Sequence, residues 1–376
     1  MPLRITPVAT RRDIREFIRL PFAVYRRGPT IYDAWVPPLN MDVRRIFDPK
    51  RNSLYDHSDM QGFLARDGDR VVGRAVAIVD RNYCAYQNTQ TGFWGYYESF
   101  DRPDAAQALL GTCEDWVKER GMRRIIGPVH GSTGNQMGNL IDAFDLMPVI
   151  DMPYAPPFYA ALFENAGYGK EKDLYSYRQE IGHMLSEKIL RVAAIAEERN
   201  RVEIRTVDMK RWDEELDNAR QIYDDAWADN WGYVPWHKPD FAALAQDLKL
   251  AVNPEFTYVA SIDGETAGFM IPIPDLNPGF HKAGGRLLPF GIFHLLAAKK
   301  NASMLRVAAM GVRKKFQNRG IDAIFIARLD RDASSFGFTL GDMSWILEDN
   351  VPLRNLLDKW GAEHYRTHRV YGKDLG

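Results

Sequence analysis

The stretch that decides the fold is LRVAAMGVRKKFQNRGID, residues 305–322. Residues 305–312 are typical of an apolar strand, and a helix is expected from 321 to about 336. The turn between them contains one glycine, Gly320, which lets the backbone approach a ligand closely. The free N–H groups and positive dipole end of such a helix suit an anion such as a pyrophosphate. Four side chains add positive charge to this turn: Arg313, Lys314, Lys315 and Arg319.

This turn matches neither the Walker loop nor the GxGxxG fingerprint, because the paired glycines and the terminal Lys-Ser or Lys-Thr are missing. A turn with one glycine is a weak signal. A helix start that binds only water is therefore an equally good interpretation of these residues alone.

The order of expected elements around this motif occurs twice. The second half shows a strand from 202, helices at 213–227 and 238–250, a strand pair at 256–262 and 266–273, a strand at 304–312, the helix at 321–336, a strand at 342–347, a short helix at 352–360 and a strand pair around 363–370. The first half shows a strand pair at 62–66 and 71–80, a strand at 91–100, a helix to about 120 and a strand at 124–126. This predicts an α/β protein with domains at 1–180 and 202–376 joined by a linker helix within 181–201.

The composition agrees with two folded domains. The chain has 376 residues, of which 45% are hydrophobic and 26% charged, and its formal net charge is −1. These values argue against disorder and against a basic nucleic-acid-binding surface. The two cysteines lack metal-ligand spacing, so we expect no metal site and a reducing cytoplasmic setting. No signal peptide and no bilayer-spanning stretch is expected, which leaves at most a peripheral membrane contact.

The strand, the Gln-x-x-Gly-x-(Gly or Ala) turn, the helix and Asn350 followed by Gly361 together resemble the GNAT superfamily of acyl-CoA-dependent acyltransferases. The resemblance implies two tandem GNAT-like domains, each a mixed, mostly antiparallel sheet flanked by helices. It also implies acyl-CoA as co-substrate. It places Asn350 near the pantetheine arm and Asp322, which departs from the usual small residue, with its carboxylate facing away from phosphate. The remaining implied contacts are Ala309, Met310, Gly311 and Val312 along pantetheine, and Gln317, Asn318, Arg319, Gly320 and Ile321 around the pyrophosphate.

Leu357 occupies the position where many GNAT enzymes have the tyrosine that protonates the leaving thiolate. Tyr365 and His364 are possible substitutes, although a structural role is the simpler interpretation of each. Glu348 and Asp342 are the leading candidates for the base that deprotonates an amine. Residues 348–350 are also suited to capping the helix that follows them.

The first half contains no Gln-x-x-Gly turn. Its helix opens with Asp101-Arg102-Pro103-Asp104, whose acidic side chains suit capping and oppose phosphate. We therefore expect one CoA site per chain, with a degenerate first domain that helps to form the acceptor pocket.

A narrower resemblance covers nearly the whole chain and rests on six segments: WVPP at 35–38, GFWGYYE at 92–98, GP at 127–128 with Ser132, MPY at 152–154 with PP at 156–157, NWGYVP at 230–235 and GRLLP at 285–289. These segments are similar to a bacterial group of GNAT-like proteins that includes the ceramide synthases. The resemblance implies transfer of a long acyl chain to the amine of a lipid such as a sphingoid base. Two alternatives remain open: a small or peptidic amine acceptor, and a non-catalytic acyl-CoA-binding protein.

The candidate acceptor-binding residues lie in three places: Asn230, Trp231, Tyr233 and Trp236 in one aromatic loop, Arg286 at the start of the apolar segment 286–298, and His130. The apolar segment could line an acyl tunnel, lie on an anionic membrane, or form a buried helix between the domains. His130 is as readily a structural histidine, and the aromatic loop is as readily packing between domains.

Overall fold

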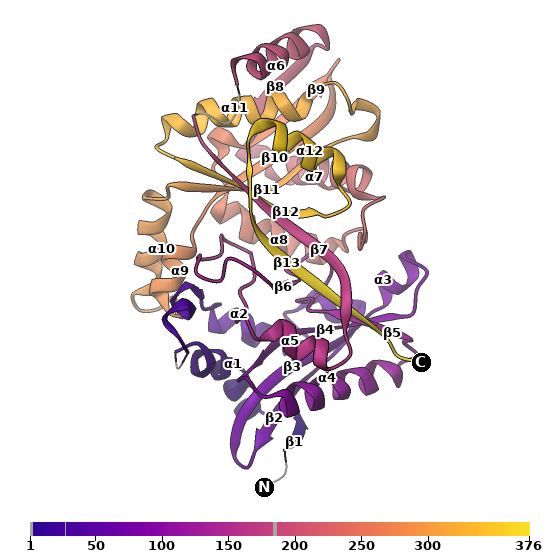
Figure 1. Ribbon diagram of the computed structural model, residues 1–376. Coiled ribbons are helices and arrows are strands. Elements are labelled where there is room, and N and C mark those ends of the chain that lie inside the picture. The colour runs from indigo at the N-terminus through magenta and orange to yellow at the C-terminus, as the bar shows by residue number, and fades with distance from the viewer. Residues whose placement is uncertain (1–2, 27, 183–185) are drawn as a thin grey trace. The chain divides into compact units, whose positions relative to one another are not determined.

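The computed structural model describes residues 3–26, 28–182 and 186–376 (Figure 1). The chain divides into two compact units, residues 1–174 with 277–298 and 366–376, and residues 175–276 with 299–365. These units differ from the expected domains because two late segments belong to the first unit. The expected linker 181–201 includes residues 183–185, which lie outside the described residues, and contains helix α6 (Glu187–Arg199).

The first unit is a mixed sheet with strand order β1-β2-β3-β4-β5-β13. Its strands are β1 (Arg4–Pro7), β2 (Ser58–Asp67), β3 (Arg70–Asp80), β4 (Thr91–Ser99), β5 (Arg124–Gly127), β6 (Asn139–Leu140) and the later part of β13 (Glu363–Asp374). Its helices are α1 (Arg11–Tyr25), α2 (Asn40–Arg45), α3 (Arg81–Tyr86), α4 (Pro103–Lys118), α5 (Tyr159–Asn165), α9 (Asn277–Ala283) and most of α10 (Gly291–Lys300). The apolar face of α4, with Leu109, Leu110 and Cys113, is buried in the core of this sheet. The hairpin β2–β3 turns at Gly68, as expected.

The second unit is a mixed sheet with strand order β7-β12-β11-β10-β9-β8. It comprises the later part of β7 (Gly169–Glu180), β8 (Val202–Thr206), β9 (Tyr258–Ile262), β10 (Glu265–Pro274), β11 (Met304–Val312) and β12 (Leu340–Leu347), with helices α6, α7 (Trp212–Trp227), α8 (Lys238–Ala251), α11 (Ile321–Ser335) and α12 (Val351–Trp360). Ile324, Phe325 and Leu329 of α11 are buried in its core.

Neither unit is contiguous, because the chain returns to the first unit at 277–298 and again near its end. The chain leaves the first unit within β7 after Leu174 and returns to it within β13 at Arg366. Residues 371–374 of β13 pair antiparallel with 124–127 of β5. The strand beside β5 in the sheet of the first unit therefore comes from the end of the chain. The expected strand pair around 363–370 is therefore wrong, because these residues form one long strand. Within the described residues, no helix is long and apolar enough to cross a bilayer.

Candidate functional site

The candidate site of the second unit begins where two parallel strands separate. β11 and β12 pair at Met304↔Leu340, Leu305↔Gly341 and Arg306↔Asp342, and their register goes no further among the described residues. On its other side β11 pairs with β10 as far as Val312, with a bulge at residue 308. The backbone of 307–312 therefore presents one edge without a strand partner, and an extended molecule with amide groups fits such an edge.

The turn after β11 has the geometry that an anion requires. Gly320 is the N-cap of α11 with φ +78°, and Asn318 also has a positive φ, +62°. No side chain caps this helix, so its first N–H groups are left for water or a ligand. The Gln317 amide donates to the Val312 carbonyl at 3.4 Å and closes the turn.

The positive charge at this turn is smaller than the sequence implies. Lys314 pairs with Asp229 at 2.5 Å, and both Arg313 and Lys315 pair with Glu265. Arg319 is exposed, lies over the Phe316 ring at 5.4 Å, and has no carboxylate partner among the described residues. Arg319 is thus the basic side chain best placed to contact a phosphate. Asp322 is half-buried in the first turn of α11.

Two of the expected catalytic residues are hydrogen-bonded to each other. The Tyr365 hydroxyl donates to the Asp342 carboxylate at 2.6 Å, and the Ser344 hydroxyl donates to its other oxygen. Asp342 is fully buried. Arg306, opposite Asp342 in the register, donates to the Ser344 carbonyl at 3.1 Å. Arg306 and Ser344 were not predicted, although Asp342 and Ser344, two apart on a strand, necessarily share a face.

The third expected catalytic residue lies at the other end of β12. Glu348 is half-buried just after the strand, about 20 Å along the chain from Asp342 at the usual rise per residue. The two carboxylates therefore cannot serve one reacting group together. Asn350 caps α12 by accepting a hydrogen bond from the Leu353 N–H at 3.3 Å. This is the capping role for which residues 348–350 were also suited. Leu357 is buried in the core.

An aromatic cluster covers β11 beside this site. Gly311 lies directly under the Trp227 ring, since a Cβ there would be 2.4 Å from it. Tyr223 stacks on Trp227 with ring centroids 4.5 Å apart, and Tyr233 and Trp236 lie against Tyr223. Burial raises the pKa of Tyr223 to about 12. Two of the four expected loop residues thus belong to the cluster, whereas Asn230 and Trp231 are both half-buried in the same loop.

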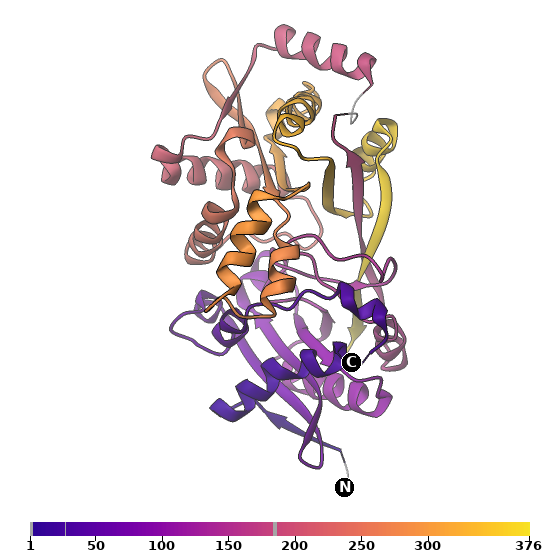
Figure 2. The ribbon, with the colours of Figure 1, turned by 90° about the vertical axis from the view of Figure 1, so that its left-hand side faces the viewer.

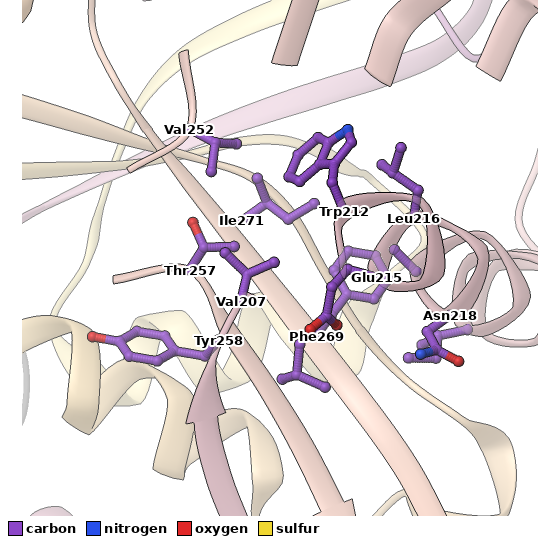
Figure 3. Close-up of a pocket in the computed structure, with 13 residues that line it drawn as sticks. Val207, Trp212, Glu215, Leu216, Asn218, Val252, Thr257, Tyr258, Phe269 and Ile271 are labelled. Carbon is purple, nitrogen blue, oxygen red and sulfur yellow. The ribbon is translucent and has the colours of Figure 1, made fainter. Parts of the chain in front are cut away.

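A small apolar cavity lies on the same side of the sheet, between α7 and strands β9 and β10 (Figure 3). Trp212, Phe269 and Ile271 are among its lining residues, and the Phe269 ring stacks with Trp227 at 6.2 Å. Its volume is about 40 Å³. Such a space holds one or a few water molecules rather than a long acyl chain.

The other two expected acceptor residues, His130 and Arg286, belong to the first unit. His130 packs against the Tyr96 ring at 4.9 Å, and burial together with the Arg74 charge lowers its pKa to about 4. Arg286 is exposed between α9 and α10 (Gly291–Lys300). Near His130, Arg74 lies 3.8 Å from Glu98, whose pKa is raised by burial. No sequence pattern pointed to this pair of Arg74 and Glu98.

Two parallel strands, β4 and β5, also separate in the first unit, but there a residue of the same unit fills the gap between them. β4 and β5 pair at Thr91↔Arg124, Gly92↔Ile125 and Phe93↔Ile126. Beyond them Val129 donates its N–H to the Trp94 carbonyl at 2.9 Å and lies against Gly95. Arg102 is the N-cap of α4 and no side chain caps that helix, so the expected acidic cap is wrong.

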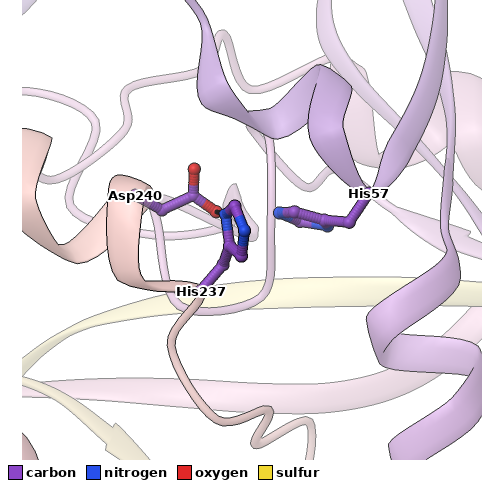
Figure 4. Close-up of side chains that lie close together, drawn as sticks. All are labelled: His57, His237 and Asp240. Atoms are coloured by element: carbon purple, nitrogen blue, oxygen red, sulfur yellow. Dashed lines mark ion pairs between the residues drawn. The ribbon is translucent and has the colours of Figure 1, made fainter.

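Two histidine–carboxylate pairs were also missed by sequence reasoning. In the first unit His57 is buried with its Nδ1 2.9 Å from Asp80. In the second unit Nδ1 of His237 lies 3.8 Å from Asp240 at the start of α8 (Figure 4). His57 and Asp80 come from separate elements, which residue spacing does not reveal. His237 and Asp240 are three residues apart, and this spacing could have identified the pair.

Known structures share this fold. A tandem GNAT protein from the clavulanic acid biosynthesis pathway superposes with a TM-score of 0.56 at 13% identity, covering 100% of this chain and 99% of that one. A GCN5-related N-acetyltransferase from Sphaerobacter thermophilus gives 0.54 at 14% identity, over 99% and 96%. The protein is thus built of two GNAT-type α/β units in tandem. No family model matches the chain.

Sequence relatives define the family more narrowly. The chain is 33% identical to the bacterial ceramide synthase of Caulobacter vibrioides, over 99% of this chain and 98% of that protein. It is 32% identical to protein YghO of Escherichia coli, over 97% and 94%. The chain belongs to the GNAT acyltransferase family that contains this ceramide synthase.

Proposed function

We propose that the protein transfers a long acyl chain from acyl-CoA to the amine of a lipid, with a sphingoid base as the first candidate. The observation that carries this proposal is the separation of β11 from β12 beside the N-terminus of α11. The unpaired edge of β11 suits the amides of a pantetheine arm, and the helix start suits a pyrophosphate. The lipid acceptor is inferred from the relative named as a ceramide synthase.

In this proposal each predicted CoA contact has a distinct task. The backbone of Ala309–Val312 hydrogen-bonds the pantetheine arm, and residues 317–321 with the Arg319 side chain hold the phosphates. Asn350 uses its side-chain oxygen to cap α12, which leaves its Nδ2 as a donor to the arm. The Asp322 carboxylate is directed away from the phosphates.

The proposed chemistry is direct attack of the amine on the thioester. The nitrogen–carbon bond forms as the carbon–sulfur bond breaks, the amine loses a proton to a base, and the thiolate takes up a proton. A covalent acyl-cysteine is disfavoured because burial raises the pKa of both Cys84 and Cys113, which keeps them as unreactive thiols.

Glu348 is the better candidate base. Both Asp342 oxygens already accept hydroxyl protons, and the side chain is fully buried, so the carboxylate is already engaged within the protein. Glu348 is less buried and lies at the end of β12 where the strands have separated. We assign Asp342 to positioning Tyr365, whose hydroxyl is the candidate donor to the thiolate in the absence of the usual tyrosine.

The acceptor is proposed to bind beside the aromatic cluster, with Asn230, Trp231, Tyr233 and Trp236 as contacts. Acceptor binding by Arg286 and His130 stays a prediction from the sequence. The first unit has no open strand edge at β4, so we propose one acyl-CoA per chain. The protein would act at the cytoplasmic surface of a membrane that supplies its lipid. No metal is required.

Purified protein incubated with acetyl-, octanoyl- and palmitoyl-CoA, each with sphinganine, spermidine or a lysine peptide, tests the proposal through release of CoA thiol. We expect release only with a long-chain acyl-CoA and sphinganine together. Turnover of acetyl-CoA with a small amine would support the alternative acceptor class. Tight palmitoyl-CoA binding without thiol release would support a non-catalytic role, which the buried Leu357 favours.

A further inference from the structure

The segment between β10 and β11 leaves a cluster of large apolar side chains exposed. We propose that α9, α10 and the loop joining them dock the protein on an anionic lipid bilayer. This inference builds on the proposed function by naming the surface for the membrane contact, and its test uses no acyl-transfer measurement.

The apolar side chains of this segment are too exposed for a soluble helix without a partner. Leu288, Phe290 and Phe293 are 77%, 71% and 62% exposed, and Leu296 is 58% exposed. A helix that is apolar on all sides is normally buried. In α10 the only buried residue is Gly291. The segment is therefore not a buried helix of the first unit.

The charges of residues 277–300 indicate an anionic binding partner. Residues 277–300 contain no Asp or Glu, and Lys282, Arg286, Lys299 and Lys300 are all exposed. Apolar side chains with a basic rim fit an interface of acyl chains and anionic headgroups. A second copy of the same surface would bring these cations against one another, which disfavours a symmetric dimer.

The surface is presented by a fixed hairpin of helices. α9 and α10 lie side by side (Figure 2), and Gly279 allows this approach because a Cβ there would be 2.8 Å from the His294 carbonyl oxygen. The Asn277 amide donates to the Pro148 carbonyl at 2.6 Å, and Gly285 accepts from the Asn40 N–H at 2.9 Å. The apolar side chains thus protrude from a base anchored in the first unit.

The test is co-sedimentation of the full chain with vesicles of phosphatidylcholine alone or with about a quarter phosphatidylglycerol, which supplies the anionic charge. We expect binding to the anionic vesicles that falls with added salt. The double variant Phe290→Ser/Phe293→Ser should bind about tenfold more weakly or worse, because two inserting side chains are lost. Lys299→Gln/Lys300→Gln should lose the preference for anionic vesicles.

The matched control is Val192→Ser/Ile195→Ser on α6, whose side chains are similarly exposed at 56% and 62%. It should bind as the unchanged protein does. Equal unfolding temperatures of all variants exclude misfolding. Absent or charge-independent vesicle binding would overturn the proposal, as would a dimer in sedimentation that Phe290→Ser/Phe293→Ser dissociates. Loss of acyl transfer with intact vesicle binding would count only against the proposed function.

Discussion

Gly320 combines a left-handed backbone with a position at the start of α11. Replacing it with alanine adds a Cβ at φ +78° and 3.0 Å from the Ala196 Cβ. We expect Gly320→Ala to lose about 1 kcal/mol of stability and to bind palmitoyl-CoA about tenfold more weakly, as the turn shifts to relieve strain. Isothermal titration measures the affinity.

Gly264→Ala is the control for Gly320→Ala, because Gly264 has φ +80° in the β9–β10 turn with no neighbour near its Cβ. It should show the same loss of stability with unchanged affinity. Equal affinity in both variants would show that the turn does not hold the CoA.

Glu348 and Asp342 should differ in what their substitution changes. Glu348→Gln should reduce the rate of acyl transfer by about 10²–10⁴ with unchanged palmitoyl-CoA affinity, as expected for loss of a general base. Asp342→Asn should destabilise the fold by about 1–3 kcal/mol, because it disturbs a buried hydrogen-bond network. It should also slow acyl transfer, because Asp342 positions the Tyr365 hydroxyl. A nearly unchanged rate of acyl transfer for Glu348→Gln would show that another residue is the base.

His130 should make stability fall in mild acid. Its pKa is about 4 in the folded protein against an ordinary histidine value of 6.5, so the unfolded chain binds more protons between these values. Stability should therefore decrease as pH falls from about 6.5 towards 4, by at most about 3 kcal/mol from this residue. Urea unfolding at pH 7 and pH 5 should show a smaller loss for His130→Asn than for the unchanged protein. Identical losses would contradict the assigned environment.

At the scale of elements, the sequence predicted the hairpins β2–β3 and β9–β10 and the helices α4, α7 and α11, because their apolar spacing and turn residues are local signals. β7 was missed and β13 was misjudged. Both carry many charged residues, such as Lys170 and Arg178 in β7, so neither shows a clear apolar alternation. The placement of β13 beside β5 depends on contacts between residues about 245 positions apart, which local patterns do not encode.

The candidate site was predicted as a motif but not as a set of contacts. The Gln317–Gly320 turn follows from its sequence. The pairing of Lys314 and Lys315 with Asp229 and Glu265, and of Tyr365 with Asp342, joins separate elements that only the folded chain brings together.

Because the end of β13 belongs to the first unit, a substitution near the end of the chain should destabilise the core of that unit. Tyr371 is buried in the core of the first unit, so Tyr371→Ala should cost about 3–5 kcal/mol there. Hydrogen exchange should then accelerate in β3–β5 and leave β10 and β11 protected. Trp360→Ala, in the core of the second unit, should give the opposite pattern. Faster exchange of β10 and β11 in Tyr371→Ala would contradict the assignment of β13.

At the scale of the whole molecule, two related units provide one open strand edge. In the first unit, Val129 hydrogen-bonds to Trp94 of β4 just beyond the paired part of β4 and β5. In the second unit, the described residues provide no such partner where β11 and β12 separate. Titration with CoA should therefore give one site per chain. A stoichiometry of two would show that the first unit also binds CoA.

The protein is proposed to join an acyl chain from CoA to the amine of a lipid. The most direct measurement is mass spectrometry of the products formed from deuterated palmitoyl-CoA and sphinganine. We predict an N-acylated sphinganine carrying the deuterated chain, absent with Glu348→Gln. Unchanged sphinganine beside protein that binds palmitoyl-CoA tightly would contradict the claim.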